Sequence, residues 1–205
     1  MPTFKSLAIL CLLPLQALVA QAIEAPLPNY TVEDIIWDIE VFPGQERQNF
    51  TGTIQEVTRQ VLAINPQWEL PVANKSAPRT DMETLEKRVW TDWKTLNCGG
   101  GPYKWATANS DVIREGIEYL RGLSEDPRQR PQNRPGGCGR VSCSYNSAIW
   151  WCNDNKVLWT LDYWTDIGDG AFFINFRCAN DQTRRVVGQA FTSVNWNVIV
   201  RGDKC

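Results

Sequence analysis

The C-terminal half of the sequence predicts an α+β fold: an antiparallel sheet with two helices packed on one face, stabilised by disulfides. Six cysteines fall within residues 89–205. Apolar residues in that region alternate between helical and strand spacing, in the order strand, helix, two strands, helix, two strands. Two helices on one face of an antiparallel sheet bury the apolar side of each element, so this order predicts an α+β sandwich.

Local signals place the first strand at 95–98 and the first helix at 111–123. Asn109 or Ser110 caps the helix, and Asp111 in its first turn suits the positive end of the helix dipole. The sequence Ser-Glu-Asp-Pro that follows the helix ends it, because the residue before a proline disfavours helical geometry.

Residues 139–154 predict a β-hairpin, because alternating residues flank a turn near Asn146-Ser147. Such a turn brings Cys143 and Cys152 onto neighbouring strands. The two cysteines then either pair with each other or point to the two helices.

The second helix is expected at 160–178, where apolar residues keep a spacing of three to four. Gly168 and Gly170 weaken this helix by roughly 1 kcal/mol each. Strands at 186–192 and 196–201 complete the predicted sheet.

The first 22 residues have the pattern of a secretory signal peptide. Lys5 supplies the positive start, residues 7–15 the apolar centre, and Ala20-Gln21-Ala22 or Leu18-Val19-Ala20 the small-residue cleavage signal. The apolar run is too short to span a bilayer, and no other stretch approaches about 20 apolar residues. We therefore expect a secreted, extracellular protein without a transmembrane anchor.

Composition changes at the dibasic pair Lys87-Arg88. Residues 23–88 contain no cysteine, six basic and eleven acidic residues, and three N-glycosylation sequons, whereas residues 89–205 contain fourteen basic and twelve acidic residues and no sequon. Carboxylate-lined subsites of secretory processing proteases suit two consecutive cations. We therefore predict a signal peptide at 1–22, a pro-segment at 23–88 that is partly helical or disordered, and a mature domain at 89–205. The sequons are at Asn29, Asn49 and Asn74.

Chance is the alternative explanation of the dibasic pair, and a second pair exists at Arg184-Arg185. The second pair lies between Cys178 and Cys205, where we expect the folded chain to shield it. In the pro-segment, four apolar residues at helical spacing predict one helix across 54–64. The segment is either a glycosylated cover for the mature half or a spacer.

The six cysteines of the C-terminal half predict three disulfides, with fifteen connectivities open. A zinc site is a weak alternative, because the chain has no histidine and these cysteines form no CxxC pair. No metal and no cofactor is therefore expected. The cysteines are Cys98, Cys138, Cys143, Cys152, Cys178 and Cys205.

Several segments of residues 95–205 together carry a resemblance. They are Cys98, the helix at 111–123, the segment GRVSCSYNSAIWWCND at 139–154, Gly-Gln-Ala-Phe at 188–191 and Asn-Val-Ile-Val-Arg at 197–201. The segments resemble small secreted cysteine-rich proteins of filamentous fungi. The element order is similar to that of the killer-toxin-like αβ fold, which includes smut-fungus killer toxins and the necrosis-inducing effector domain. The resemblance implies an effector- or toxin-like role and carries over no functional residue.

Two groups of residues are candidates for a binding surface. Trp150 and Trp151 are consecutive, so in a strand they face opposite sides of the sheet, and an exposed ring would bind sugars or proteins. Core packing is the competing interpretation. The arginines around the loop form a cationic patch that would suit a membrane surface or an acidic partner. They are Arg128, Arg130, Arg134 and Arg140.

Carboxylates offer the one enzymatic alternative, because paired carboxylates hydrolyse glycosides without histidine. Asp162, Asp166 and Asp169 recur on one face of the second predicted helix, where a solvated face is the competing interpretation. Asn153-Asp154-Asn155 is interpreted as a turn, since it lacks the glycine and distal glutamate of an EF-hand loop.

The absence of histidine excludes Ser-His-Asp and Cys-His catalysis, and a formal net charge of −2 argues against nucleic-acid binding. We therefore expect a monomeric secreted protein that is not an enzyme and has no catalytic residue. It acts by binding a host or microbial protein, a membrane surface or a wall glycan. The alternatives are a cell-wall glycan-binding module and a histidine-free carboxylate hydrolase.

Overall fold

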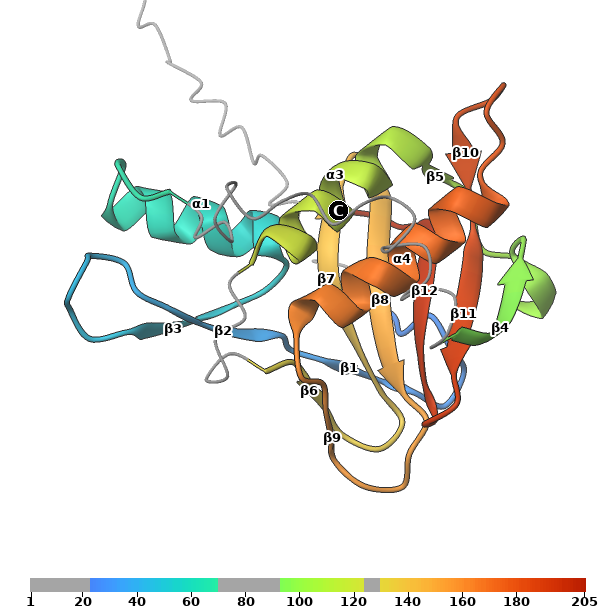
Figure 1. Cartoon of the computed structure of the whole chain (residues 1–205), viewed down its shortest axis with the longest axis horizontal. Helices are drawn as coiled ribbons and strands as arrows, with labels where there is room; N and C mark the ends of the chain where they lie inside the picture. The colour runs from blue at the N-terminus through green and yellow to red at the C-terminus, as the bar shows by residue number, and fades with distance from the viewer. Residues whose placement is uncertain (1–22, 70–92, 124–129) are drawn as a thin grey trace, which may run out of the picture.

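In the computed structural model, which describes residues 23–69, 93–123 and 130–205, the chain folds around a six-stranded sheet (Figure 1). β1 pairs in parallel with β7, whereas all other neighbours are antiparallel. The prediction of an antiparallel sheet is therefore wrong at one edge, because β1 comes from the N-terminal segment. In spatial order the strands are β1 (Thr31–Glu33), β7 (Gly137–Ser144), β8 (Ser147–Asn153), β12 (Trp196–Gly202), β11 (Gly188–Thr192) and β4 (Trp93–Cys98).

Both helices predicted in the C-terminal half are confirmed, as α3 (Ser110–Gly122) and α4 (Trp164–Cys178). They pack against each other over one face of the sheet (Figure 1). The Asn109 side chain caps α3 by accepting hydrogen bonds from the backbone N–H groups of Asp111 and Val112.

The predicted hairpin is also confirmed, with its turn at Tyr145 and Asn146. Both residues have positive φ, 44° and 56°, the geometry of the two-residue turn whose twist matches paired strands. The register shifts between Arg140 and Ser142, so that Cys138 faces Cys152 whereas Cys143 faces Ala148. This irregularity decides which cysteines are neighbours.

The N-terminal segment has more regular structure than the single helix predicted for it. A hairpin of β2 (Ile36–Ile39) and β3 (Gln48–Thr51) precedes α1 (Ile54–Ile64). Thr53 and Glu56 form a capping box at the start of α1. Ile54, Val57 and Val61 are buried as the helical spacing predicts. The remaining short elements are η1 (Gly101–Tyr103), the pair β5 (Ala108–Asn109) and β10 (Arg185–Val186), and the pair β6 (Gln132–Asn133) and β9 (Trp159–Thr160).

The main hydrophobic core crosses the expected boundary between pro-segment and mature domain. It lies between the sheet and the helices and includes Trp37 and Val57 from one side of that boundary and Trp151 and Ile167 from the other. α1 contacts β7 on the same face as α3, because Gln55 bonds the Ser142 hydroxyl that also lies beside Gly116 of α3. The expected division into a front segment and a self-contained body is therefore not reflected in the packing.

Three disulfides are present in the described residues, as predicted. They join Cys98 to Cys178, Cys138 to Cys152, and Cys143 to Cys205. Cys143 and Cys152, whose pairing was left open, do not pair with each other. The first bridge joins β4 to the end of α4, and the other two lie on the sheet face opposite the helices, where a second, smaller core surrounds Trp150. Across the described part of the chain, no helix is both long and apolar enough to cross a membrane.

Candidate functional site

The two consecutive tryptophans lie on opposite faces of the sheet, as predicted, but neither is a binding surface. Trp150 and Trp151 are both 0% exposed. Trp151 packs in the core under the helices, and Trp150 packs on the opposite face with Leu27 and Cys138. The second face is covered by residues near the N-terminus, which the local sequence around the tryptophans does not reveal.

The predicted arginine patch is divided by the fold. Arg130 lies 3.5 Å from Asp162, and Arg134 lies 3.9 Å from Glu33, so each has a carboxylate beside it. Arg140 is not part of the loop; it lies on β7 with its side chain only 8% exposed. Arg128 is outside the described residues.

The three aspartates of the predicted second helix have separate structural partners. Asp162 precedes α4, Asp166 accepts a hydrogen bond from the Tyr163 N–H at its start, and Asp169 lies 2.6 Å from Arg121 of α3. Carboxylates that hydrolyse a glycoside flank one cleft. These three do not line either cavity described below, so the arrangement gives the hydrolase alternative no support.

The acidic turn at 153–155 is a turn as predicted. Asn153 accepts a hydrogen bond from the Asn155 N–H, and the Asn155 amide binds the carbonyls of Val194 and Asn195. No group of three histidine, cysteine or acidic side chains suited to a metal occurs among the residues the structure describes.

The predicted modification sites fall partly outside the described residues, where Asn74 and Lys87-Arg88 lie. Asn29 and Asn49 are exposed, as a glycosylated asparagine must be. Arg184 and Arg185 are also exposed, which corrects the expectation that the fold shields them; Arg184 pairs with Asp111 at 2.7 Å.

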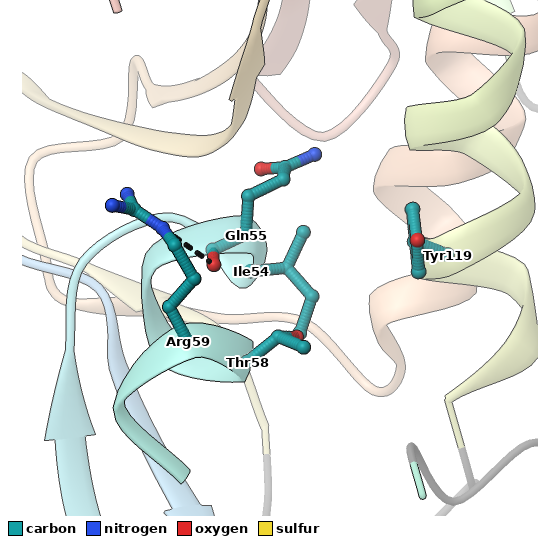
Figure 2. Close-up of a pocket in the computed structure, with 5 residues that line it drawn as sticks. All are labelled: Ile54, Gln55, Thr58, Arg59 and Tyr119. Carbon is teal, nitrogen blue, oxygen red and sulfur yellow. Dashed lines mark hydrogen bonds between the residues drawn. The ribbon is translucent and has the colours of Figure 1, made fainter. Parts of the chain in front are cut away.

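Two cavities are candidates for a ligand site. The smaller, of about 210 Å³, lies between α1 and α3 (Figure 2). Ile54, Thr58 and Arg59 approach it from α1 and Tyr119 from α3, and the Gln55 amide turns away to bind β7. The lining is mainly apolar, and this cavity marks the seam between the N-terminal segment and the rest of the molecule.

The larger cavity, of about 710 Å³, is a charged cleft near the C-terminus that we call the C-terminal cleft. It combines acidic side chains from the first described residues and from α1 with basic and acidic side chains from β7, β12 and the C-terminal residues. Its lining residues are Ile23, Glu24, Glu56, Arg140, Arg201, Asp203, Lys204 and Cys205.

Two arginines and one aspartate organise the C-terminal cleft. The guanidinium carbons of Arg140 and Arg201 each lie 5.7 Å from the centre of the Trp150 ring. Asp203 accepts a hydrogen bond from the Trp150 indole N–H at 2.9 Å and lies 3.1 Å from Arg201 and 3.9 Å from Arg140. The Nε atoms of both arginines are buried and make no hydrogen bond to the described residues. Two cations therefore share one carboxylate.

The sheet face that carries Trp150 also carries a partly buried polar cluster around Asp154. The Asp154 carboxylate accepts hydrogen bonds from the Tyr30 hydroxyl at 2.8 Å and from the Asn197 amide at 2.9 Å. Asn197 accepts in turn from Gln189. The cluster fixes the N-terminal segment to β8 and β12, since Tyr30 precedes β1.

Burial and the bond to Asp154 raise the pKa of Tyr30 to about 12 from its ordinary value of 10.0. Because the unfolded chain loses this proton near pH 10 and the folded chain keeps it, the stabilising contribution of Tyr30 is present below pH 10 and decreases from there to about pH 12. We expect Tyr30→Phe to flatten this decrease in a comparison of unfolding curves across that range. Equal slopes in both proteins would contradict the assignment.

Sequence reasoning missed Arg201, Asp203, Lys204 and Glu24 as site residues. A weak signal existed: charged residues cluster directly before Cys205, and a cysteine in a disulfide fixes its neighbours in space. The partner of that disulfide, and hence the location of the cluster beside Arg140, follows only from the fold.

Comparison of the chain with protein-family models, with curated proteins and with solved structures finds no match.

Proposed function

We propose that this is a secreted, effector- or toxin-like protein that acts by binding, and that the C-terminal cleft receives an anionic group of its target. The observation that carries the proposal is the pair of mostly buried guanidiniums, Arg140 and Arg201, that share the single carboxylate of Asp203. Predicted secretion and the three disulfides support an extracellular role, since such bridges persist in oxidising compartments.

The sharing of one counter-charge by two guanidiniums explains why an anion suits this cleft. A guanidinium with little access to water needs a counter-charge and hydrogen-bond acceptors, and here a single carboxylate serves two guanidiniums. Lys204 adds a third cation at the rim. Glu24 and Glu56 also line the cleft, and the Glu56 carboxylate caps α1. A carboxylate, sulfate or phosphate on the target would therefore form charge-assisted hydrogen bonds with the guanidiniums.

Binding assays with defined probes test this proposal. We expect calorimetry on the purified full chain to detect an acidic peptide or a sulfated oligosaccharide, with affinity that falls as salt is raised, and not a neutral glucan oligosaccharide. The two anionic probes distinguish a protein target from a glycan target. Arg201→Gln should weaken binding at least tenfold, because it removes a fixed positive charge that the anionic group of the target needs once it is bound in the cleft.

Two further variants separate a lost site from a damaged fold. Arg134→Gln removes a side chain that is 80% exposed and lies outside the cleft, so it should bind like the parent. Lys204→Gln at the exposed rim should also weaken binding. Unchanged affinity in both Arg201→Gln and Lys204→Gln, or no binding of either anionic probe, would refute the site.

One observation favours glycan binding as the second candidate. Tyr103, which is 43% exposed, stacks on Trp105 with ring centres 5.0 Å apart. A flat aromatic surface of this kind suits a sugar ring. If the glycan function is correct, chitin or glucan retains the parent protein and releases Tyr103→Ala, while Arg201→Gln is retained normally.

We also propose that the protein is processed after Arg88, following a signal peptide at residues 1–22. Support comes from the change in cysteine, sequon and charge usage at that pair. Intact-mass measurement of the secreted chain tests the cut: a product that begins at Val89 is expected, and a single polypeptide that spans residue 88 would contradict it.

A further inference from the structure

Residues 23–69 contact the C-terminal body on both faces of the sheet. On the face that carries two disulfides, Leu27 joins the small core around Trp150. The Trp105 indole N–H donates a hydrogen bond to the Pro26 carbonyl at 2.9 Å, and Tyr30 donates to Asp154 at 2.8 Å. These contacts hold residues 26–30 of the N-terminal segment against the sheet.

The strand that receives the segment is shaped for it. β1 pairs in parallel with β7 over residues 137–139. A Cβ at Gly139 would overlap Ile35, and a Cβ at Gly137 would lie 3.1 Å from the Glu33 carboxyl carbon and closer still to its Cγ. Ile35 is only 4% exposed. The two glycines therefore leave the space that the N-terminal segment fills.

Contacts under the helices are equally close. The Trp37 ring stacks on the Trp164 ring of α4 with centroids 4.0 Å apart and planes inclined by 12°. From α1, the Gln55 amide donates to the Ser142 hydroxyl at 2.8 Å and accepts from the Cys143 N–H at 3.0 Å. The segment thus supplies core side chains and also satisfies backbone polar groups of β7.

No disulfide in the described part of the chain joins residues 23–69 to the rest. All three bridges lie within residues 98–205. We infer that residues 23–69 are a permanent, noncovalent subunit of the body, so that a cut at Lys87-Arg88 produces a two-chain protein and not a free domain of residues 89–205. Only the occurrence of the two-chain form in the secreted protein depends on the proposed processing.

The structural part of the inference is testable without natural processing. In a full-length variant, the Lys87-Arg88 pair is replaced by the recognition sequence of a site-specific protease. The variant is cut in denaturant with its disulfides intact and then returned to native buffer. We expect the two fragments to co-elute as one species in gel filtration and to separate again in denaturant. A C-terminal fragment that folds and elutes alone would overturn the inference.

Two glutamines on α1 provide a matched pair of variants. Gln55→Ala removes the two hydrogen bonds to β7 and should weaken association of the cut fragments at least tenfold. Gln60→Ala removes a bond to the Thr51 carbonyl within the segment itself and should leave association unchanged. Equal dissociation constants for the two variants would show that the contacts at β7 do not hold the fragments together.

The dibasic pair that is exposed in the structure gives an internal contrast. A cut after Arg185 leaves its pieces joined by the bridge between Cys143 and Cys205, so they migrate together in denaturant until a reductant is added. A cut after Arg88 should release a separate band without reductant. Intact mass of the secreted protein decides whether processing occurs, and co-elution decides whether the segment stays bound, so the two failures are distinguishable.

Discussion

Trp37→Ala is expected to lower the free energy of unfolding of the intact protein by about 3–5 kcal/mol, the usual cost of truncating a buried aromatic ring. Trp37 is 0% exposed and stacks on Trp164. Its indole N–H also donates to the Gly52 carbonyl at 2.8 Å, so truncation leaves a partly buried acceptor without that donor as well as a cavity.

Urea unfolding monitored by circular dichroism measures this effect, and the neighbouring residue gives the control. Ile36 lies on the same strand but is 62% exposed, so Ile36→Ala should change stability by no more than about 0.5 kcal/mol. If Trp37→Ala were as stable as Ile36→Ala, the N-terminal segment would not contribute to the global core. A pro-segment that folds independently of the body would then regain support.

Local patterns predicted the helices and the hairpin of the C-terminal half because the determining residues lie close together in the sequence. Asn109 caps α3 by binding amides two and three residues away, and the turn at Tyr145 and Asn146 joins adjacent strands. The number of disulfides followed from an even cysteine count. In each case the interaction is set within a few residues or by composition alone.

The parallel strand β1 and the role of Ile35 could not be predicted in the same way. The polar and acidic character of residues 23–69 and the lack of cysteine there suggested a removable segment. The complementary signal is in β7, where Gly137 and Gly139 lack the side chains that would block the segment. Glycine in a strand marks a close approach but does not identify the partner.

The candidate site was predicted least well, because its parts meet only through long-range contacts. Arg140 appeared to belong to a loop patch, yet its pair with Arg201 across β8 depends on sheet order. The sequence left Trp150 open to either core packing or ligand contact, and in the structure residues near Leu27 and the C-terminal Asp203 cover it. Neither cover is adjacent to Trp150 in sequence.

Gly170→Ala is expected to destabilise the protein by about 1–3 kcal/mol, the range for overpacking a core, although alanine is the better helix former by about 1 kcal/mol. The helix pattern alone treats Gly170 as a weakness of α4. In the structure, a Cβ at this position would lie 2.7 Å from Val198 and overlap the Trp93 ring. The Trp93 ring is held in turn by an edge contact with Trp196 at 5.2 Å, so it has little room to move.

The second glycine of α4 separates packing from propensity. A Cβ at Gly168 would meet Arg121 Cγ at 3.1 Å and Leu120 at 3.3 Å, and the long arginine side chain can shift by a few tenths of an ångström. Gly168→Ala should therefore be close to neutral, because the propensity gain offsets the tighter contact. Thermal unfolding of both variants gives the comparison. A Gly170→Ala protein at least as stable as Gly168→Ala would show that α4 does not need this close approach to β4 and β12, and the packing of the helix on that end of the sheet would have to be revised.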